Sequence, residues 1–258
     1  MKKSIELEKY LNQQFHFYHN KDFITLDPIS VPHRFSKLQD IEISAFFAAI
    51  FSWGNRKTII NKSLELMHMM DDSPHEFIVS HSPSHLKKVL GFKHRTFNTD
   101  DLLYFIHFLK YHYASNNSLE SAFTKNMKTS DKNIENALIG FRDYFFSLPD
   151  YLERTKKHIS SPLSKSTCKR LCMLLRWMVR SNSKSIDFGI WNNIKPHQLI
   201  IPLDVHVMKT ALKLKLLPND KVNWNAAVLL TNKLRIFDSK DPVKYDFALF
   251  GSSIQPNE

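Results

Sequence analysis

Glycine is scarce in this sequence: 5 of 258 residues, about 2% where globular proteins average about 7%. No two of these glycines form a Gly-x-Gly pair. The phosphate-binding loops of dinucleotide-binding and P-loop proteins need clustered glycines so that the backbone can approach the phosphate closely, which excludes both classes. With few residues suited to positive φ, the chain is expected to form helices joined by ordinary loops.

Cysteine and long apolar runs are also lacking. The two cysteines, Cys168 and Cys172, would share one helix face, poorly placed for a disulfide, and cannot supply the four thiolates of an iron–sulfur cluster. Apolar runs such as 45–51 fall short of the roughly 18–20 residues that a membrane span needs. The N-terminus lacks the apolar core of a secretory signal. We therefore expect a cytoplasmic monomer with no membrane contact, metal, iron–sulfur cluster or other cofactor.

Positive charge is present in excess. Lysine and arginine number 36 against 25 acidic residues, a formal charge of +11, while 43% of the residues are hydrophobic and 24% charged. The composition is that of a folded protein and excludes a disordered chain. The basic balance predicts an acidic partner such as a nucleic acid.

Apolar residues recur at helical spacing nearly throughout, which predicts an all-α fold. Short helix and turns are expected over 73–85, a Pro-bounded loop over 27–32, and a polar irregular segment over 181–202. Asp40 and either Thr99 or Asp100 are expected to cap helices. Gly54 and Asn55 are expected to break one helix, and a further helix follows them and runs to about 70. The other predicted helices cover residues 4–19, 41–52, 100–114, 118–126, 132–147, 149–157, 167–180, 205–215, 224–235 and 241–250.

Two segments in the C-terminal half carry the strongest functional pattern. Residues 201–207, Ile-Pro-Leu-Asp-Val-His-Val, open a helix at Asp204, and residues 163–169, Leu-Ser-Lys-Ser-Thr-Cys-Lys, end at Lys169. Together they resemble the helix-hairpin-helix DNA glycosylase superfamily, the group of endonuclease III and 8-oxoguanine glycosylase. The resemblance implies that Asp204 and Lys169 are catalytic. In the superfamily hairpin, Leu-Pro-Gly-x-Gly-x-Lys, two positions are glycine where this chain has Lys165 and Thr167.

The same resemblance implies a double-stranded DNA partner and two helical lobes flanking a central cleft. Lobe one would cover about 45–180 and lobe two about 1–44 plus 181–258, within a single unit of residues 1–258. Residues 51–62 are similar to a segment that enters the duplex, and residues 91–95 to a turn of the oxoguanine branch. The implied DNA contacts are Lys165, Ser166, Thr167, Arg170, Asn55, Arg56, Lys57, Lys93, His94, Arg95 and His206, and the implied base pocket is Trp53, Phe92 and Trp177.

A closer resemblance, over about 27–251, is to a bacterial family defined by a domain of unknown function, the 2400 family. The runs that carry it are Asp-Pro-Ile-Ser-x-Pro-His-Arg-Phe from Asp27, Gly-Phe-Lys-His-Arg-Thr-Phe from Gly91, Leu-Arg-Trp-Met-Val-Arg from Leu175, and Asp-Pro-Val-Lys-Tyr-Asp-Phe-Ala-Leu-Phe-Gly from Asp241.

The chemistry implied by the glycosylase resemblance is base excision, with or without strand scission as an abasic-site lyase. A carboxylate stabilises the positive charge that develops on the sugar. A lysine amine, whose pKa neighbouring cations lower, attacks the sugar carbon. An 8-oxoguanine-like base, flipped out of the duplex, is the expected substrate.

The alternatives are a DNA- or RNA-binding protein that cleaves nothing, and a helical protein–protein adaptor. In those alternatives Lys169 is a solvated lysine, Asp204 only a helix cap, and Trp53 and Trp177 core residues.

Overall fold

The computed structural model describes residues 2–181 and 185–254, which form helices joined by short turns. No strand occurs in these two ranges, where an isolated bridge joins His94 to Phe97. The all-α prediction is therefore confirmed. Residues 182–184, in the predicted irregular segment, lie outside the described residues. The α-helices are α1 (Lys2–Tyr18), α2 (Asp22–Thr25), α3 (Leu38–Phe51), α4 (Arg56–Met69), α5 (Pro74–Ser80), α6 (Pro83–Lys88), α7 (Thr99–Tyr113), α8 (Glu120–Thr124), α9 (Glu135–Phe145), α10 (Lys169–Val179), α11 (Val205–Lys213), α12 (Trp224–Leu234) and α13 (Asp246–Ile254).

Short 3-10 helices fill several of the turns between the α-helices. They are η1 (Pro28–Ser30), η2 (Pro32–Arg34), η3 (Glu153–His158), η4 (Pro162–Ser164), η5 (Pro196–Gln198) and η6 (Pro242–Tyr245). The α-helix expected over 149–157 is wrong, because its only helical part is η3. Asp40 does not cap α3, whose N-cap is Lys37; it accepts a hydrogen bond from the His75 N–H at 2.8 Å instead. The cap of α7 is Asn98, one residue before the two candidates.

The chain forms two compact units. Unit 1 contains Met1–Phe23, Lys128–Asn136 and Ser161–Glu258; unit 2 contains Ile24–Met127 and Ala137–Ser160. The division differs from the predicted lobes, because α10 belongs to unit 1 and residues 24–44 to unit 2. A physical reason for the place of α10 lies at its C-terminal end. There the Phe188 N–H donates to Trp177 O at 2.7 Å and the Trp191 N–H to Met178 O at 2.9 Å.

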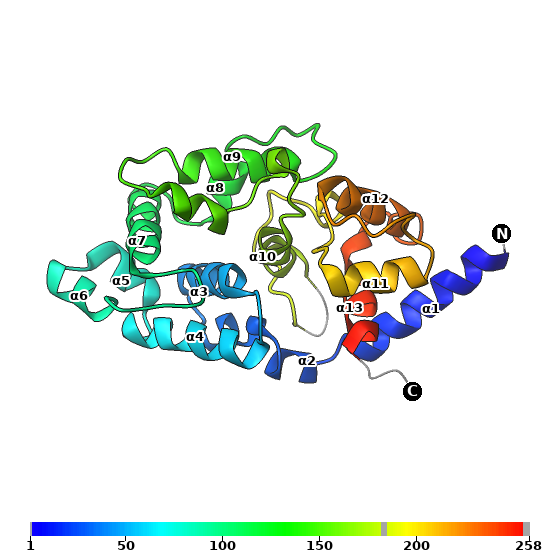
Figure 1. The fold of residues 1–258 in the computed structure, drawn as a ribbon, viewed down its shortest axis with the longest axis horizontal. Helices are drawn as coiled ribbons and strands as arrows, with labels where there is room; N and C mark the ends of the chain where they lie inside the picture. The colour runs from blue at the N-terminus through cyan, green and yellow to red at the C-terminus, as the bar shows by residue number, and fades with distance from the viewer. Residues whose placement is uncertain (1, 182–184, 255–258) are drawn as a thin grey trace. The chain divides into compact units, whose positions relative to one another are not determined.

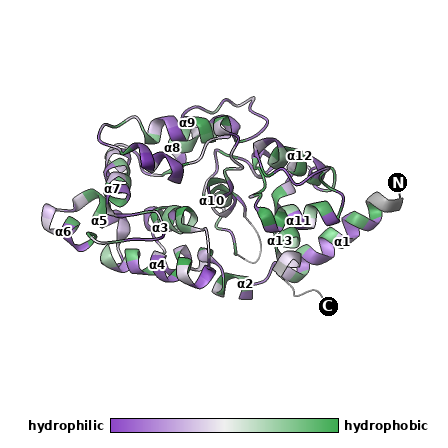
Figure 2. Cartoon of the chain, in the orientation of Figure 1, coloured by the Kyte–Doolittle hydropathy of each residue, from purple (hydrophilic) through white to green (hydrophobic). Residues whose placement is uncertain are grey.

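Unit 2 is built around α3. Residues 41–51 of this helix are all buried, and green, the colour of hydrophobic residues, predominates on it in Figure 2. Phe46 stacks on Phe105 of α7 at 5.6 Å between ring centroids, and Phe105 meets Phe145 of α9 edge to face at 4.7 Å. Burial on all sides explains why this helix is apolar around its whole circumference.

Unit 1 joins the two ends of the chain. The N-terminal helix α1 packs along the C-terminal helix α13, blue beside red in Figure 1, and α11 also packs on α13. The Tyr18 ring lies so close to Gly251 that a Cβ there would come within 2.3 Å of it. Phe15 meets Phe247 edge to face at 6.2 Å between centroids. These contacts fix α13 against α1, and α11, whose N-cap Asp204 is the first predicted catalytic residue, packs on the same helix.

Candidate functional site

A tight hairpin leads into α10. Ser161 begins it by accepting, through Oγ, a hydrogen bond from the Leu163 N–H at 3.3 Å. Lys165 and Cys168 then adopt left-handed backbone conformations, with φ of +57° and +52°. Such a conformation costs a residue with a side chain roughly 1–2 kcal/mol. At Lys165 the surroundings hold it, because Lys165 O accepts a hydrogen bond from the Trp224 N–H of α12 at 3.2 Å.

Asp204 stands at the start of α11 as its N-cap. Its Oδ1 accepts hydrogen bonds from the N–H groups of His206 at 2.9 Å and Val207 at 3.0 Å. The backbone before it is fixed by the Ile201 N–H, which donates to Thr231 Oγ1 at 3.0 Å. The cap uses one carboxylate oxygen, so that Oδ2 points to another neighbour.

That neighbour is Lys169. Its Nζ lies 4.0 Å from Asp204 Oδ2, and the two side chains are 26% and 24% exposed. The residues are 35 positions apart in the sequence, and each lies at the N-terminal end of a helix in unit 1. Partial burial limits the screening of this pair by water while leaving both groups open to a ligand. The structure thus brings together the amine and the carboxylate that were predicted to act together.

The other predicted DNA contacts of unit 1 lie within a few residues of Lys169 or Asp204 in the sequence. Lys165 and His206 are exposed, whereas Ser166, Thr167 and Arg170 are half-buried. Burial lowers the pKa of the Arg170 guanidinium to about 10, so it stays protonated at neutral pH. Three cationic side chains within six residues make the hairpin a strongly positive segment.

Among the predicted contacts of unit 2, Arg95 lies against Trp53. The Arg95 guanidinium lies 4.3 Å from the centroid of the Trp53 ring, a cation–π contact. Gly54 makes this approach possible, because it has a φ of +109° and a Cβ there would come within 2.4 Å of Arg95 Nη1. Asn55 caps α4 by accepting from the Thr58 N–H at 3.2 Å. The exposed side chains of this group are Asn55, Lys57, Lys93 and Arg95, while Arg56 and Trp53 are half-buried.

Three predicted site residues are core residues instead. Phe92 and His94 of unit 2 are 1% and 2% exposed, and Trp177 of unit 1 is fully buried. His94 Nε2 lies 3.0 Å from Phe51 O at the end of α3, and burial lowers the pKa of its imidazole. A buried neutral imidazole on a backbone carbonyl is a structural contact, not a phosphate ligand. The predicted base-pocket roles of Phe92 and Trp177 and the DNA contact of His94 are corrected accordingly.

The model of one protein family, described as "Protein of unknown function (DUF2400)", matches residues 27–255. This chain belongs to that family. The matched range contains every predicted site residue, and it confirms the resemblance to the 2400 family. No curated protein and no solved structure matches the chain.

In this DUF2400 protein, sequence reasoning missed a buried ionic network on α10. Arg176 and Arg180, 4% and 2% exposed, contact the carboxylates of Asp187, Asp241 and Asp246. The spacing of the two arginines could have indicated this network, because they lie four residues apart on the buried face of an amphipathic helix. Charged side chains on such a face are almost never buried without partners of opposite charge.

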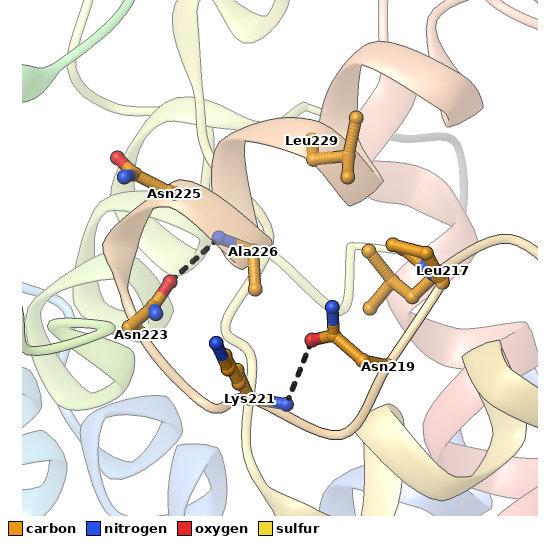
Figure 3. A pocket seen from close by; sticks show the side chains of 8 residues that line it. Leu217, Asn219, Lys221, Asn223, Asn225, Ala226 and Leu229 are labelled. Atoms are coloured by element: carbon orange, nitrogen blue, oxygen red, sulfur yellow. Dashed lines mark hydrogen bonds between the residues drawn. The ribbon is translucent and has the colours of Figure 1, made fainter.

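A shallow pocket of about 200 Å³ lies where the chain enters α12 (Figure 3). Its lining is mostly amide and apolar, and Lys221 is its single titratable side chain. Asn223 Oδ1 accepts from the Ala226 N–H at 3.0 Å, and Asn219 Oδ1 from the Lys221 N–H at 3.2 Å. Asn219 and Asn223 therefore take part in shaping the turn. The pocket contains none of the predicted catalytic residues.

Two negative findings apply to residues 2–181 and 185–254. No group of three or more histidine, cysteine, aspartate or glutamate side chains in these ranges has an arrangement that could hold a metal ion. Within the same ranges, every helix is too short or too polar to cross a membrane.

Proposed function

We propose that this protein is a DNA base-excision enzyme of the helix-hairpin-helix glycosylase class, acting on an 8-oxoguanine-like base in double-stranded DNA. The observation that carries the proposal is the Lys169–Asp204 pair, 4.0 Å apart at the N-terminal ends of two helices. An amine and a carboxylate in one partly sheltered site suit cleavage of an N-glycosidic bond.

The hairpin adds support from its backbone. Lys165 occupies the first position at which the superfamily hairpin has glycine, and it takes the left-handed conformation that glycine favours. The hairpin then leads into the N-terminus of α10, where the helix dipole favours an anion such as a backbone phosphate. Thr167, at the second glycine position, is not among the residues with positive φ.

The reaction follows from the two side chains. After Lys169 has lost a proton, its Nζ lone pair forms a bond to the sugar C1′ as the C1′–N bond breaks. The base leaves with the electron pair of that bond and takes up a proton. The Asp204 carboxylate stabilises the positive charge that develops on the sugar during this step. The amine then loses its second proton as the C1′–O4′ bond breaks and O4′ takes up a proton, which gives an imine between Lys169 and C1′. Loss of a proton from C2′ to water drives β-elimination, in which the C3′–O bond breaks and the 3′ phosphate leaves with its electron pair. Water finally hydrolyses the imine, which releases the sugar fragment as an aldehyde and restores the Lys169 amine.

Borohydride trapping tests this proposal. The protein is incubated with duplexes that carry 8-oxoguanine or an abasic site, and sodium borohydride reduces any imine to a stable covalent adduct seen on a denaturing gel. We expect an adduct with the wild type, none with Lys169→Gln, and a rate at least tenfold lower with Asp204→Asn. Lys213→Gln is the matched control. Like Lys169→Gln it removes one lysine charge, but Lys213 lies at the C-terminal end of α11, at the other end of the helix from Asp204.

Two results would overturn the proposal. One is the absence of an adduct with both duplexes, and the other is an adduct that persists in Lys169→Gln. Circular dichroism of each variant shows that its fold is retained.

A second candidate function is nucleic-acid binding without cleavage. The burial of Phe92 and Trp177 favours it, since two of the three expected base-pocket residues are withdrawn from the surface. In that case the log of the DNA affinity falls linearly with the log of the salt concentration, and Asp204→Asn leaves the affinity unchanged. The Arg95–Trp53 contact then supplies a stacking and cationic surface for the nucleic acid.

A further inference from the structure

One face of α10 carries a line of titratable and cationic side chains. Lys169, Cys172, Arg176 and Arg180 are spaced by three, four and four residues, so they share one side of the helix. Lys169, at the open end, is 26% exposed, and the arginines further along are buried. The predicted nucleophile is thus the outermost member of a charged row that continues into the core of unit 1.

Three carboxyl groups meet the two buried arginines. Arg176 Nη1 donates to Asp246 Oδ2 at 2.5 Å, and Arg176 Nε lies 3.3 Å from Asp187 Oδ1. Arg180 donates to Asp187 and, from Nε and Nη2, to Asp241 at 2.8 Å. Two positive charges against three negative ones leave one carboxylate in excess. Asp241 is 26% exposed and partly solvated, but Asp187 and Asp246 are buried, and burial of an uncompensated charge is costly. A proton on one of the three restores the balance.

Asp246 is the carboxyl best placed to hold that proton. It is the first residue of α13 and is 5% exposed. Burial raises the pKa of the Asp246 carboxyl to about 6, while Arg176 lowers it. Asp204 raises that pKa further and Lys169 lowers it, so Asp246 interacts electrostatically with both members of the candidate catalytic pair.

Other titratable groups lie on the elements that pack around α13. On α10 itself, Cys172 lies between Lys169 and Arg176. Burial raises the pKa of its thiol, so Cys172 stays neutral and adds no charge to the row. The remaining groups are Glu8 and Tyr18 on α1, His19 after it, His206 on α11, and Lys244 and Tyr245 of η6.

We infer that Asp246 is a positioning residue of the Lys169–Asp204 site, whose charge, held in place by Arg176, governs how readily Lys169 releases its proton. When Asp246 is ionised, its negative charge favours the ammonium form of Lys169. When Asp246 is protonated, that attraction is lost and the neutral amine, which is the nucleophile, becomes easier to form. The part of this inference that concerns catalysis rests on the proposed function; the electrostatic part does not.

The catalytic part is tested by the pH profile of borohydride trapping. Asp246→Asn keeps the shape of the side chain and an oxygen for Arg176, and it removes the charge. We expect adduct formation at pH 7 to rise about threefold, the effect of lowering an amine's pKa by half a pH unit, and the acid limb of the profile to move to lower pH. Asp241→Asn is the matched control, because it removes one carboxylate from the same network at Arg180 and leaves the profile unchanged.

The electrostatic part is tested without DNA. Lysines are reductively methylated with ¹³C-formaldehyde, and the Lys169 signal is assigned by its loss in Lys169→Gln. The titration uses a His206→Gln background, because histidine side chains titrate between pH 5 and 8. We expect the Lys169 methyl shift to show an inflection near pH 6 that Asp246→Asn removes and Asp241→Asn retains.

The outcomes separate the two ideas. No adduct with any variant, together with the expected inflection, overturns the proposed function and leaves the link between Asp246 and Lys169 standing. An absent inflection in the wild-type Asp246 background, or one that persists in Asp246→Asn, overturns the link. Since the inflection is first measured with Asp246 intact, the test holds even where Asp246→Asn does not fold.

Discussion

Asp204 has two separable roles, and two substitutions divide them. Oδ1 caps α11, and Oδ2 faces Lys169 at 4.0 Å. Asparagine caps a helix about as well as aspartate, whereas loss of the cap to alanine costs about 1 kcal/mol. Both substitutions remove the charge, which contributes about 0.2–1 kcal/mol through a partly exposed pair and about 0.3–1 kcal/mol at a helix N-terminus. Asp204→Asn should therefore lower the free energy of unfolding by about 0.5–2 kcal/mol, and Asp204→Ala by about 1 kcal/mol more.

Urea unfolding followed by circular dichroism measures both losses, with the midpoints compared at a common slope. Repeating the series in 1 M NaCl should shrink the loss in Asp204→Asn, because salt screens the charge, while the difference between the two variants persists. Equal losses in the two variants would show that the cap contributes nothing and would refute the division of roles. Borohydride trapping should fall in both variants alike, since both lack the carboxylate.

Three further predictions concern the rest of the molecule. Gly54→Ala should lower the free energy of unfolding by about 1–3 kcal/mol, because its φ of +109° is strained for a residue with a side chain. The exposed Arg95 side chain can move away from the added Cβ, so Gly91→Ala, with a φ of +85°, should cost a similar amount; unchanged urea midpoints would contradict this. Burial would raise the pKa of Asp101, but hydrogen bonds from His158 and Thr155 lower it from 3.8 to about 2. Because the pKa of Asp101 is lower in the folded than in the unfolded protein, ionised Asp101 contributes about 2 kcal/mol of stability above pH 4, and this contribution should be lost as the pH falls towards 2. The Asp101→Asn variant should not show this loss when its stability is followed into acid. Cys168 and Cys172 are buried, and the pKa of the Cys172 thiol is raised by burial, so neither should react with a thiol reagent at pH 8 until urea unfolds the protein; prompt reaction of the folded protein would contradict this.

Local patterns in the sequence predicted most of the helices. The periodicity of apolar residues does so for α1, α7, α10, α11 and α12, because each must bury one face. Helix α3 stands out instead as a strongly apolar run. Asp204 could be placed at a helix start because capping depends on the residue type and on the few positions that follow it. Its approach to Lys169 was predicted by family resemblance alone, since no local rule brings two residues 35 positions apart within 4.0 Å.

Long-range contacts account for what the sequence could not predict. Trp177 and Phe92 look the same in the sequence whether they line a pocket or fill a core, and only the packing around them decides. The partners of Arg176 and Arg180 come from positions up to 70 residues away in the chain. Lys165 adopts a conformation that lysine does not favour, held by a hydrogen bond from α12.

The pairing of α1 with α13 has a consequence for how the protein is made on the ribosome. Helix α1 is made well before its partner α13, because unit 1 combines residues 1–23 with residues 161–258, whereas every segment of unit 2 has been translated by residue 160. Unit 2 can therefore fold during translation. The Lys169–Asp204 pair gains its backing from α13 only when that helix has left the ribosome. A nascent or truncated chain that ends before α13 should thus carry both predicted catalytic residues without a completed site.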